Sequence, residues 1–360
     1  MTEGGYMSNS GKAAPKRRPP RKRSDVTIIG GGSFGTMLAM LLAERGRHTL
    51  VWVRRQEHAE EINDEHRNVR YSGDIELPRN VAATTDLEKA IDRVPVVIMA
   101  IPSRSFREVA RRVGDHIRGD QVLVHGTKGL ERETHRRMSE ILREETCALK
   151  TGVISGPTLA REMMAGNPSG AVVASHYREV VTKVQDLFRG GRMRVYTGRD
   201  VTGTEIGGAF KNIIAIASGA SDGLGFGAMT KSLLMTRGLG EMVRFGVAND
   251  AEARTFAGLA GMGDMMANCM SPLSRNYQVG AGLAGGEALD DLLAKLDQAA
   301  EGVPTAAAVN GQAAELGLDL PIVREVHAVL FEGRAPALAL ERLMKSPVGE
   351  ELDYFGDRDR

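Results

Sequence analysis

The stretch Asp25-Val-Thr-Ile-Ile-Gly-Gly-Gly-Ser-Phe-Gly-Thr36 decides the fold of this chain. Residues 25–29 form a short β-branched run that ends in glycine, which predicts a buried parallel strand. The glycines that follow give the pattern G-x-G-x-x-G, and a segment rich in Met, Leu and Ala comes next. In this pattern Gly30 permits a tight turn, Gly32 lets a pyrophosphate approach the backbone and Gly35 lets the helix pack on the strand. The stretch therefore predicts a Rossmann unit that binds a dinucleotide at a helix N-terminus.

Strand-like and helix-like segments alternate from residue 25 to about residue 200. Further strands are expected at 49–53, 94–101, 121–125, 151–155 and 170–174, with helices at 36–45, 57–66, 105–114 and 134–145. This alternation predicts right-handed crossovers and a doubly wound parallel sheet, an α/β fold. After about Val201 the strand signals stop, and helix-forming sequence continues to about Glu341.

The domain organisation follows from this change of pattern. We expect a disordered basic tail at 1–24, a Rossmann domain at 25–200, an all-α substrate and catalytic domain at 201–345 and a C-terminal tail at 346–360. A length of 360 residues suits two domains. No Gly-Lys-Ser or Gly-Lys-Thr follows the glycine-rich turn, which excludes a mononucleotide P-loop.

Composition excludes several classes of protein. The chain is 42% hydrophobic and 26% charged, an ordinary globular profile. Cys147 and Cys269 lie far apart, and the eight histidines show no His-x-x-x-His spacing, so we expect no metal. No run of 18 apolar residues occurs, so we expect no membrane span. Only 4% of residues are aromatic, which argues against a nucleic-acid stacking surface. These features predict a cytoplasmic enzyme without a nucleic-acid partner.

The charge of the chain is uneven. Residues 1–23 hold seven basic residues and one acid, although the whole chain has a net charge of only +1. This segment has little apolar content and cannot bury enough surface to order itself. It has no apolar stretch typical of a secretory signal. Two interpretations stay open, a solvated extension and an arm that binds polyanions or a membrane surface.

The end of the second expected strand bears on the choice of cofactor. It reads Trp52-Val53-Arg54-Arg55-Gln56, whereas an NAD-preferring fold places Asp or Glu here against the ribose hydroxyls. Two guanidinium groups suit the 2′-phosphate of NADP. The sequence therefore favours NADP over NAD, and a solvated arginine pair is the alternative.

Charged residues in apolar surroundings are candidates for the chemistry. Lys211 lies in a helix so apolar that its amine must be buried, which lowers a lysine pKa toward neutrality. Such a lysine can exchange a proton with an alcohol, although a lysine whose head reaches solvent is the alternative. Asp264 also lies among apolar residues, and Lys128 follows the expected strand at 121–125, where ligands bind. The run Ser271 to Asn276 predicts a helix start beside Arg275, an arrangement that would bind an anion.

The motifs together resemble those of NAD(P)-dependent glycerol-3-phosphate dehydrogenases of the bacterial type, from about Val26 to about Leu343. The most specific elements, in chain order, are T-K-G at 127–129, S-G-P-T at 155–158, K-N at 211–212 and S-R-N at 274–276. Others are N-V-R-Y-S-G at 68–73, I-P-S at 101–103, S-D-G-L-G-F-G at 221–227, G-M-G-D-M at 261–265 and E-G at 301–302. The resemblance implies a Rossmann domain followed by a helical domain like the C-terminal domain of 6-phosphogluconate dehydrogenase.

The resemblance also implies the reversible reduction of dihydroxyacetone phosphate to sn-glycerol 3-phosphate, a step that supplies phospholipid synthesis. Lys211 matches the family's proton acceptor, Lys128 would polarise the reacting oxygen and Asp264 would orient Lys211 or a substrate hydroxyl. The implied substrate contacts are Lys128, Gly156, Thr158, Lys211, Asp264, Ser274, Arg275 and Asn276. The expected cofactor contacts, for NADP or NAD, are Gly30, Gly32, Ser33, Phe34, Gly35, Arg54, Arg55, Lys128, Ala160, Arg275 and Glu301.

Two positions depart from the family pattern. Met229 stands where members carry a polar residue, and Asn268 stands where they carry Thr. We expect Met229 near the substrate end of the site. The alternatives kept open are another two-domain NADPH reductase, such as a ketopantoate or hydroxyacyl reductase, and a weakly active paralogue that senses NADPH or triose phosphate. The sequence does not set the oligomeric state, and a homodimer is the candidate assembly.

Overall fold

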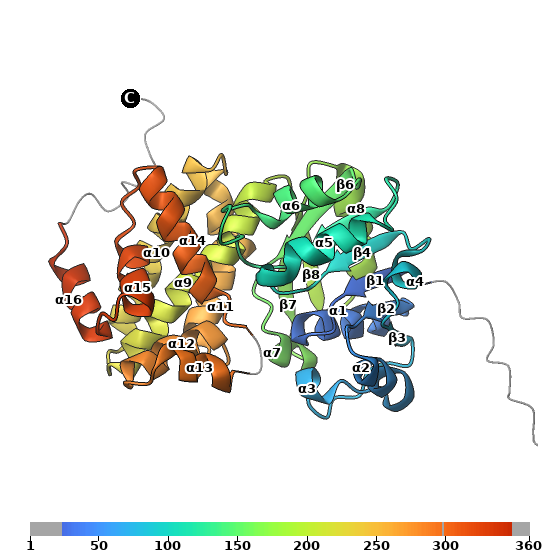
Figure 1. The fold of residues 1–360 in the computed structure, drawn as a ribbon, viewed down its shortest axis with the longest axis horizontal. Helices are drawn as coiled ribbons and strands as arrows, with labels where there is room; N and C mark the ends of the chain where they lie inside the picture. The colour runs from blue at the N-terminus through green and yellow to red at the C-terminus, as the bar shows by residue number, and fades with distance from the viewer. Residues whose placement is uncertain (1–23, 297–298, 348–360) are drawn as a thin grey trace, which may run out of the picture.

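One eight-stranded sheet occupies the first part of the chain in this computed structural model, which describes residues 24–296 and 299–347. The strand order is β3-β2-β1-β4-β5-β6-β7-β8 (Figure 1). The strands are β1 (Val26–Ile29), β2 (Thr49–Trp52), β3 (Val81–Thr84), β4 (Val96–Met99), β5 (Val122–His125), β6 (Lys150–Ser155), β7 (Ser169–Ala174) and β8 (Met193–Gly198). Both predicted tails fall almost wholly on 1–23 and 348–360, outside the described residues.

Helices cover both faces of this sheet, as a doubly wound fold requires. One core contains Val26 and Ile28 of β1 under α1 (Ser33–Glu44), α7 (Ala160–Met164) and α8 (Arg178–Phe188). Ile29 belongs to the other core, under α4 (Leu87–Ile91), α5 (Phe106–Gly114) and α6 (Met138–Glu145). Successive residues of a strand point to opposite faces, so a continuous apolar strand serves both cores.

The sheet is not parallel throughout, which corrects one part of the prediction. Strands β1 to β6 are parallel, but β6 pairs antiparallel with β7, and β8 is parallel to β7. A parallel return needs a crossover element that spans the sheet. The connection between β6 and β7 holds only the five-residue α7, which is too short to span it.

Several elements differ from the sequence expectation. Strands β3 and β8 were not expected: β3 reads Val-Ala-Ala-Thr and β8 lies at the sheet edge with half of its residues exposed. The expected helix at 57–66 is α2 (Gln56–Glu60) followed by a π-helical turn, η1 (Glu61–Glu65). Three further short elements before α5 were not expected, namely α3 (Val69–Ser72), α4 and the 3₁₀ turn η2 (Ser103–Ser105).

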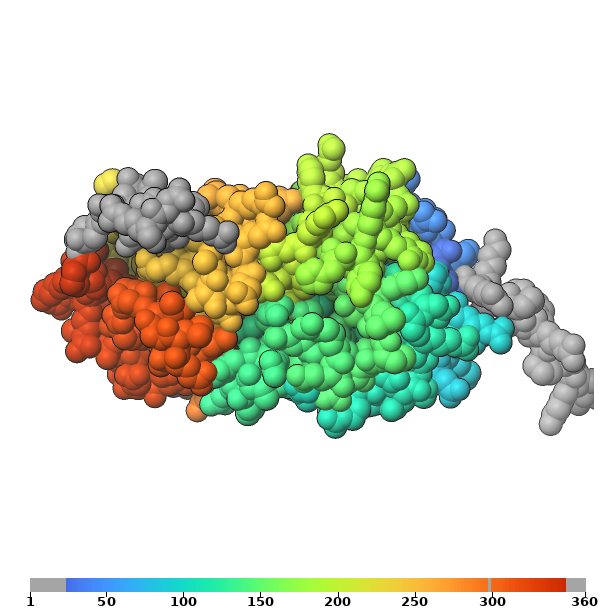
Figure 2. All heavy atoms as spheres, turned by 90° about the horizontal axis from the view of Figure 1, so that it is seen from above, coloured from blue at the N-terminus to red at the C-terminus, as the bar shows by residue number. Residues whose placement is uncertain are grey.

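The second part of the chain is helical and packs directly against the sheet part (Figures 1 and 2). Its central helix is α9 (Val201–Gly223), most of whose residues are buried. Around it lie α10 (Ala228–Ala248), η3 (Ala253–Ala257), η4 (Leu259–Gly263), α11 (Asp264–Met270), α12 (Arg275–Ala284), α13 (Leu289–Lys295), α14 (Gly302–Glu315), α15 (Pro321–Phe331) and α16 (Pro336–Lys345).

Glycines bring α9 and α12 into backbone contact. A Cβ atom at Gly280 would lie 1.9 Å from the Ile216 carbonyl oxygen, and one at Gly219 would lie 2.0 Å from the Tyr277 carbonyl oxygen. Side chains at these positions would push the helices apart. The close approach holds the N-terminus of α12 against the part of α9 that carries Lys211.

Helices able to span a membrane and clusters of metal-binding side chains are both absent from residues 24–296 and 299–347. No helix in them combines the length and apolarity needed to cross a bilayer. No group of three or more His, Cys, Asp or Glu side chains there is placed to hold a metal ion.

Candidate active site

A cleft of about 710 Å³ lies where the carboxyl ends of the sheet strands face the helical part. This is the edge at which open α/β sheets bind their ligands. Both parts of the chain contribute to its walls, and the basic side chains on them outnumber the acidic ones. The basic residues are Arg54, Arg55, Arg70, Arg104, Arg112, Lys128, Arg161, Lys211, Arg275 and Lys295, against Glu108 and Glu301.

The glycine-rich turn forms one end of this cleft. Gly30 has φ +114°, and a Cβ there would lie 2.5 Å from the Ala100 carbonyl oxygen, so the turn needs glycine. A Cβ at Gly32 would meet no atom within 4 Å, because this position opens toward the cleft. A Cβ at Gly35 would lie 1.9 Å from the Gly30 carbonyl oxygen, so this glycine serves packing and does not line the cleft. The open backbone at the start of α1 fits a pyrophosphate group.

Ser33 and Phe34, the first residues of α1, both line the cleft. The Ser33 hydroxyl donates to the Tyr71 carbonyl oxygen at 2.9 Å and so ties α1 to α3. The Phe34 ring lies over Gly126, where a Cβ would come within 2.4 Å of the ring. The absence of a side chain at Gly126 therefore leaves room for the Phe34 ring beside the end of β5.

A buried carboxylate joins the two candidate lysines. Lys128 Nζ donates to Asp264 Oδ2 at 2.7 Å, and Lys211 Nζ lies 3.4 Å from Asp264 Oδ1. Asp264 is fully buried at the start of α11, and Asn268 donates to its Oδ1 at 2.8 Å. One carboxylate therefore holds a lysine from the sheet part and a lysine from the helical part side by side.

The two lysines differ in their surroundings. Lys128 Nζ also donates to the Gly156 carbonyl oxygen at 2.9 Å and to Thr158 Oγ1 at 3.4 Å, so its position is fixed. Among the described residues, Asp264 is the one partner of Lys211 Nζ. Burial lowers the pKa of Lys211 to about 8; the Asp264 charge opposes this shift and the Lys128 charge adds to it. Lys211 is consequently the lysine that can both gain and lose a proton near neutral pH.

The N-terminus of α12 faces the same space. Ser274 is its N-cap and accepts a hydrogen bond from the Tyr277 amide. Arg275 and Asn276 begin the helix, and both line the cleft. Asn276 Nδ2 donates to Asn212 Oδ1 at 2.8 Å, and Asn276 Oδ1 accepts from the Gly302 amide at 2.9 Å. The Asn276 side chain thus ties α12 to α9 and α14, beside an N-terminus suited to an anion.

Glu301 closes the cleft where α14 meets the loop after β4. Its carboxylate accepts hydrogen bonds from the Ser103 amide, at 3.0 Å, and from the Ser103 hydroxyl. Burial raises the pKa of Glu301, against these hydrogen bonds and the charge of Arg275. The contact links the two parts of the chain across the cleft.

Arg54 and Arg55 lie exposed just beyond β2, and both line the cleft. Within the part of the chain that the structure describes, the ion pair of Arg55 is a long one, 3.9 Å from the exposed Glu57. The glycine-rich turn, the size of the cleft and its basic walls together fit a phosphorylated dinucleotide. The arginines lie at the strand end where such a dinucleotide places its adenosine ribose.

The structure brings most of the predicted site residues together around this cleft. Those that line it are Gly30, Gly32, Ser33, Phe34, Arg54, Arg55, Lys128, Thr158, Ala160, Lys211, Ser274, Arg275, Asn276 and Glu301. Gly156 and Asp264 do not line it but contact Lys128. The expectation for Met229 is wrong: this residue is 83% exposed at the start of α10 and lies outside the cleft.

Sequence reasoning missed other residues of the cleft. Asn212, which accepts a hydrogen bond from Asn276, follows Lys211 directly in the K-N motif, and Ser103, which binds Glu301, ends the I-P-S motif. The motifs that contain Asn212 and Ser103 could have identified both as site residues. Arg161 lies near the end of the longer run I-S-G-P-T-L-A-R-E at 154–162, whereas Arg104, Arg112 and Lys295 carry no motif, and only the fold places these three on the cleft wall.

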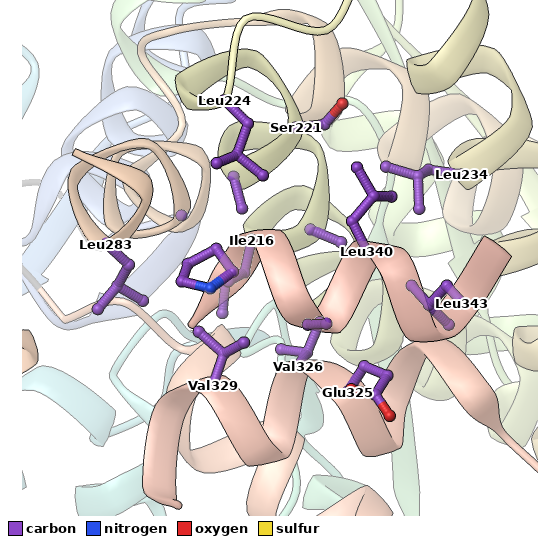
Figure 3. Close-up of a pocket in the computed structure, with 15 residues that line it drawn as sticks. Ile216, Ser221, Leu224, Leu234, Leu283, Glu325, Val326, Val329, Leu340 and Leu343 are labelled. Atoms are coloured by element: carbon purple, nitrogen blue, oxygen red, sulfur yellow. The ribbon is translucent and has the colours of Figure 1, made fainter. Parts of the chain in front are cut away.

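A second hollow in the helical part has a different character. It measures about 50 Å³ and lies between α9, α12, α15 and α16. Its walls are almost wholly apolar, and Figure 3 shows the polar side chains Ser221 and Glu325 at opposite ends. The Glu325 carboxylate already accepts from Arg334 at 2.7 Å. This hollow offers no set of groups that could carry out a reaction.

Comparisons with known proteins agree with this site. Residues 25–181 match the model of the NAD-dependent glycerol-3-phosphate dehydrogenase N-terminus, and residues 200–341 match that of its C-terminus. The chain is 44% identical over 329 residues to "Glycerol-3-phosphate dehydrogenase [NAD(P)+]" of Acinetobacter baumannii, covering 91% of this chain and 92% of the relative. It is 40% identical to the protein of the same name from Teredinibacter turnerae, covering 92% and 97%.

Solved structures show the same relationship. The crystal structure of glycerol-3-phosphate dehydrogenase from Coxiella burnetii superposes with a TM-score of 0.86 at 33% identity, covering 90% of this chain and 99% of that one. A ketopantoate reductase from Ralstonia eutropha superposes with a TM-score of 0.54 at 14% identity over 89% and 99%, a likeness of fold alone. Family models over both parts and relatives of 40% identity and more decide the assignment: this chain belongs to the family of NAD-dependent glycerol-3-phosphate dehydrogenases.

Proposed function

We propose that this protein reversibly reduces dihydroxyacetone phosphate to sn-glycerol 3-phosphate, with NADP(H) preferred over NAD(H), and so supplies the backbone of phospholipids. The observation that supports this most directly is the buried Lys128–Asp264–Lys211 arrangement, which lies between a dinucleotide cleft and the N-terminus of α12. The reaction needs a site for the cofactor, a group that exchanges a proton with the substrate oxygen and a site that binds the substrate phosphate.

The proton step belongs to Lys211. When bound, the reduced nicotinamide supplies a hydride, and the substrate carbonyl oxygen then carries negative charge. A protonated Lys211 donates its proton to that oxygen, and the neutral amine takes the proton back in the oxidative direction. A pKa of about 8 allows both forms near neutral pH. Lys128, which donates a 2.7 Å hydrogen bond to Asp264, polarises the same oxygen.

The substrate phosphate is assigned to the start of α12. The helix N-terminus presents amide groups and a positive dipole end, and Arg275 adds a guanidinium at its first position. Ser274 and Asn276 keep this end in place through their hydrogen bonds to Tyr277, Asn212 and Gly302. An anion held here would lie beside the part of α9 that carries Lys211.

Neither alternative function has a specific observation in its favour. A ketopantoate reductase shares the fold at 14% identity, which says nothing of substrate. The sensor interpretation relied on Met229 and Asn268. Met229 lies outside the cleft, and Asn268 donates to Asp264, which supports the charged group that the reaction needs.

The test is NADPH oxidation that depends on added dihydroxyacetone phosphate, followed at 340 nm with purified protein. We expect turnover with this substrate, little with ketopantoate and less with NADH at equal concentration. Reduction of ketopantoate in preference to the triose phosphate would favour the first alternative. Binding of NADPH without turnover of either substrate would favour the sensor.

A cytoplasmic location and a homodimer complete the proposal. The reaction uses phosphorylated metabolites and NADPH, which are cytoplasmic compounds. Sedimentation velocity at several protein concentrations tests the assembly, and a monomer throughout would remove the homodimer. Fractionation of cells tests the location.

A further inference from the structure

Helix α5 presents one face to the cleft at the adenosine end. Glu108, Val109 and Arg112, spaced by one and three residues, all line the cleft. Arg111, the neighbour of Arg112, points to the other side and binds Glu145, with Nε 2.9 Å from the carboxylate. Two adjacent arginines of one helix therefore have different environments, and only Arg112 faces the cleft.

Arg112 lies over the ring of Trp52, the last residue of β2. Its guanidinium carbon is 5.3 Å from the ring centroid. Trp52 is 2% exposed, and its indole N–H donates to the Thr85 carbonyl oxygen at 3.0 Å, so the ring cannot turn. A guanidinium over an aromatic face is oriented by it and keeps its N–H groups free at the edges.

This contact places Arg112 near the strand end that carries Arg54. Within the described residues no carboxylate comes within 4.0 Å of the guanidinium of either arginine. The guanidinium of Arg112 thus lies on the wall of the cleft without an ion pair, and Glu108, one helical turn before it on the same face, is the nearby acidic side chain of the cleft wall. An exposed guanidinium that an aromatic face orients at such a place suits an anion.

We propose that Arg112 is a specificity-determining residue, which binds the 2′-phosphate of NADP(H) together with Arg54 and Arg55. This inference rests on the proposed NADP(H) preference and names a residue of α5 that contributes to it. The 2′-phosphate carries close to two negative charges and three acceptor oxygens at neutral pH, so a third guanidinium beside the exposed pair at 54–55 adds a further charge-assisted hydrogen bond to it. Trp52 supplies the surface on which the third guanidinium is oriented.

The test compares dissociation constants, measured by isothermal titration calorimetry, for NADPH, NADH and the fragment 2′,5′-ADP. The variant is Arg112→Met, which keeps an aliphatic stem on Trp52 and removes the charge. The matched control is Arg111→Met, which removes the neighbouring arginine and its ion pair with Glu145. Arg112→Lys keeps a charge without the planar fork, and melting temperatures show that each variant is folded.

We expect Arg112→Met to weaken NADPH and 2′,5′-ADP binding by on the order of 10-fold, with NADH binding changed by less than about 2-fold. Arg112→Lys should give a smaller loss, and Arg111→Met should change none of the three constants. All three dissociation constants are measured by binding alone, so this test does not depend on whether the protein turns over its substrate.

Two results would overturn the inference. Equal weakening of NADPH and NADH would show that Arg112 supports the adenine or the local packing, and unchanged NADPH binding would show that it has no role. A wild-type protein that bound NADH as tightly as NADPH would instead contradict the proposed cofactor preference itself. Should Arg112→Met not fold, the same comparison with Arg112→Lys decides between these outcomes.

Discussion

Lys211 and Asp264 form a buried ion pair across two helices: Nζ of Lys211 in α9 lies 3.4 Å from Oδ1 of Asp264 in α11, and neither side chain is more than 6% exposed. Burial alone would drive the lysine to its neutral form, and the carboxylate opposes this by stabilising the ammonium. The balance of the two effects gives the pKa of about 8. This relationship makes the chemistry of the site sensitive to pH and to Asp264.

The two directions of the reaction should depend on pH in opposite ways. Oxidation of glycerol 3-phosphate needs a neutral Lys211, so its rate should rise with pH through about 8 and then level off. Reduction of dihydroxyacetone phosphate needs the ammonium, so its rate should fall above the same pH. Initial rates at saturating cofactor from pH 6 to 10, measured in both directions, test this. Parallel profiles in the two directions would rule out Lys211 as the titrating group.

Asp264→Asn should move this pH profile. The variant removes the charge that raises the pKa of Lys211, so the rising limb of the oxidative profile should shift to lower pH. The maximal rate should also fall, because Lys128 loses its 2.7 Å partner. Asn268→Ala is the control, since it removes a hydrogen bond to Asp264 but leaves the charge. An unshifted limb in Asp264→Asn would contradict the coupling.

Glu205 should be important for stability rather than for chemistry. This buried carboxylate accepts from the Ser139 amide at 2.7 Å and from Arg137 at 3.0 Å, and it lies 3.1 Å from His125 Nε2. It therefore joins α9 to β5 and α6. Burial acts to raise its pKa, but the His125 contact, the Arg137 charge and the Ser139 hydrogen bond outweigh this and lower it.

Glu205→Ala should reduce the free energy of unfolding by about 3–5 kcal/mol, because it leaves buried donors and a charge without a partner. Urea denaturation at pH 7 measures this. Since the carboxyl pKa is lowered on folding, the contribution is complete above the pKa of the unfolded chain and is lost as the pH falls below it. The control Glu179→Ala removes a carboxylate that binds Lys150 and Lys183 on the surface, and its effect should be small.

Arg54→Ala combined with Arg55→Ala should reduce the preference for NADPH over NADH by about 10-fold to 100-fold, the value of one or two charge-assisted contacts. Both side chains are exposed at the end of β2, so the fold should not suffer. The measurement is kcat/KM for each cofactor at fixed dihydroxyacetone phosphate. A double variant with an unchanged ratio would show that these arginines do not bind the 2′-phosphate.

Local sequence predicted the parts of the fold that depend on local pattern. The motif at residues 30–35 specifies a turn, a close helix contact and an open backbone, and the structure has each at the expected glycine. Strand β3 could not be predicted, because Val-Ala-Ala-Thr is short, has Val81 as its one large apolar side chain and pairs with β2 along its whole length. The residues of β7 do not encode its direction either, since this follows from the shortness of the connection through α7 and not from the strand itself.

The candidate site shows the same division. Lys211, Asp264 and Lys128 stood out because each is a charge in an apolar context or at a strand end. That Asp264 contacts both lysines depends on how α11 packs against α9 and on where the loop after β5 places Lys128, which no local pattern encodes. Met229 shows the opposite error: its place in a family motif suggested the substrate end, yet the start of α10 turns it to solvent.

Lys211→Met tests the assignment on which the proposed mechanism depends. The substitution keeps most of the side-chain volume and removes both the charge and the proton, so turnover should fall by about 10²–10⁴-fold, the usual effect of losing a positioned acid or base. NADPH binding, measured by calorimetry, should change little, because Lys211 is not among the contacts expected for the dinucleotide. Lys128→Met is the comparison: its ammonium is fixed by Asp264 and Gly156, so its loss should raise KM for dihydroxyacetone phosphate more than it lowers kcat. If Lys211→Met kept more than a tenth of the wild-type turnover, the proton would have to come from Lys128.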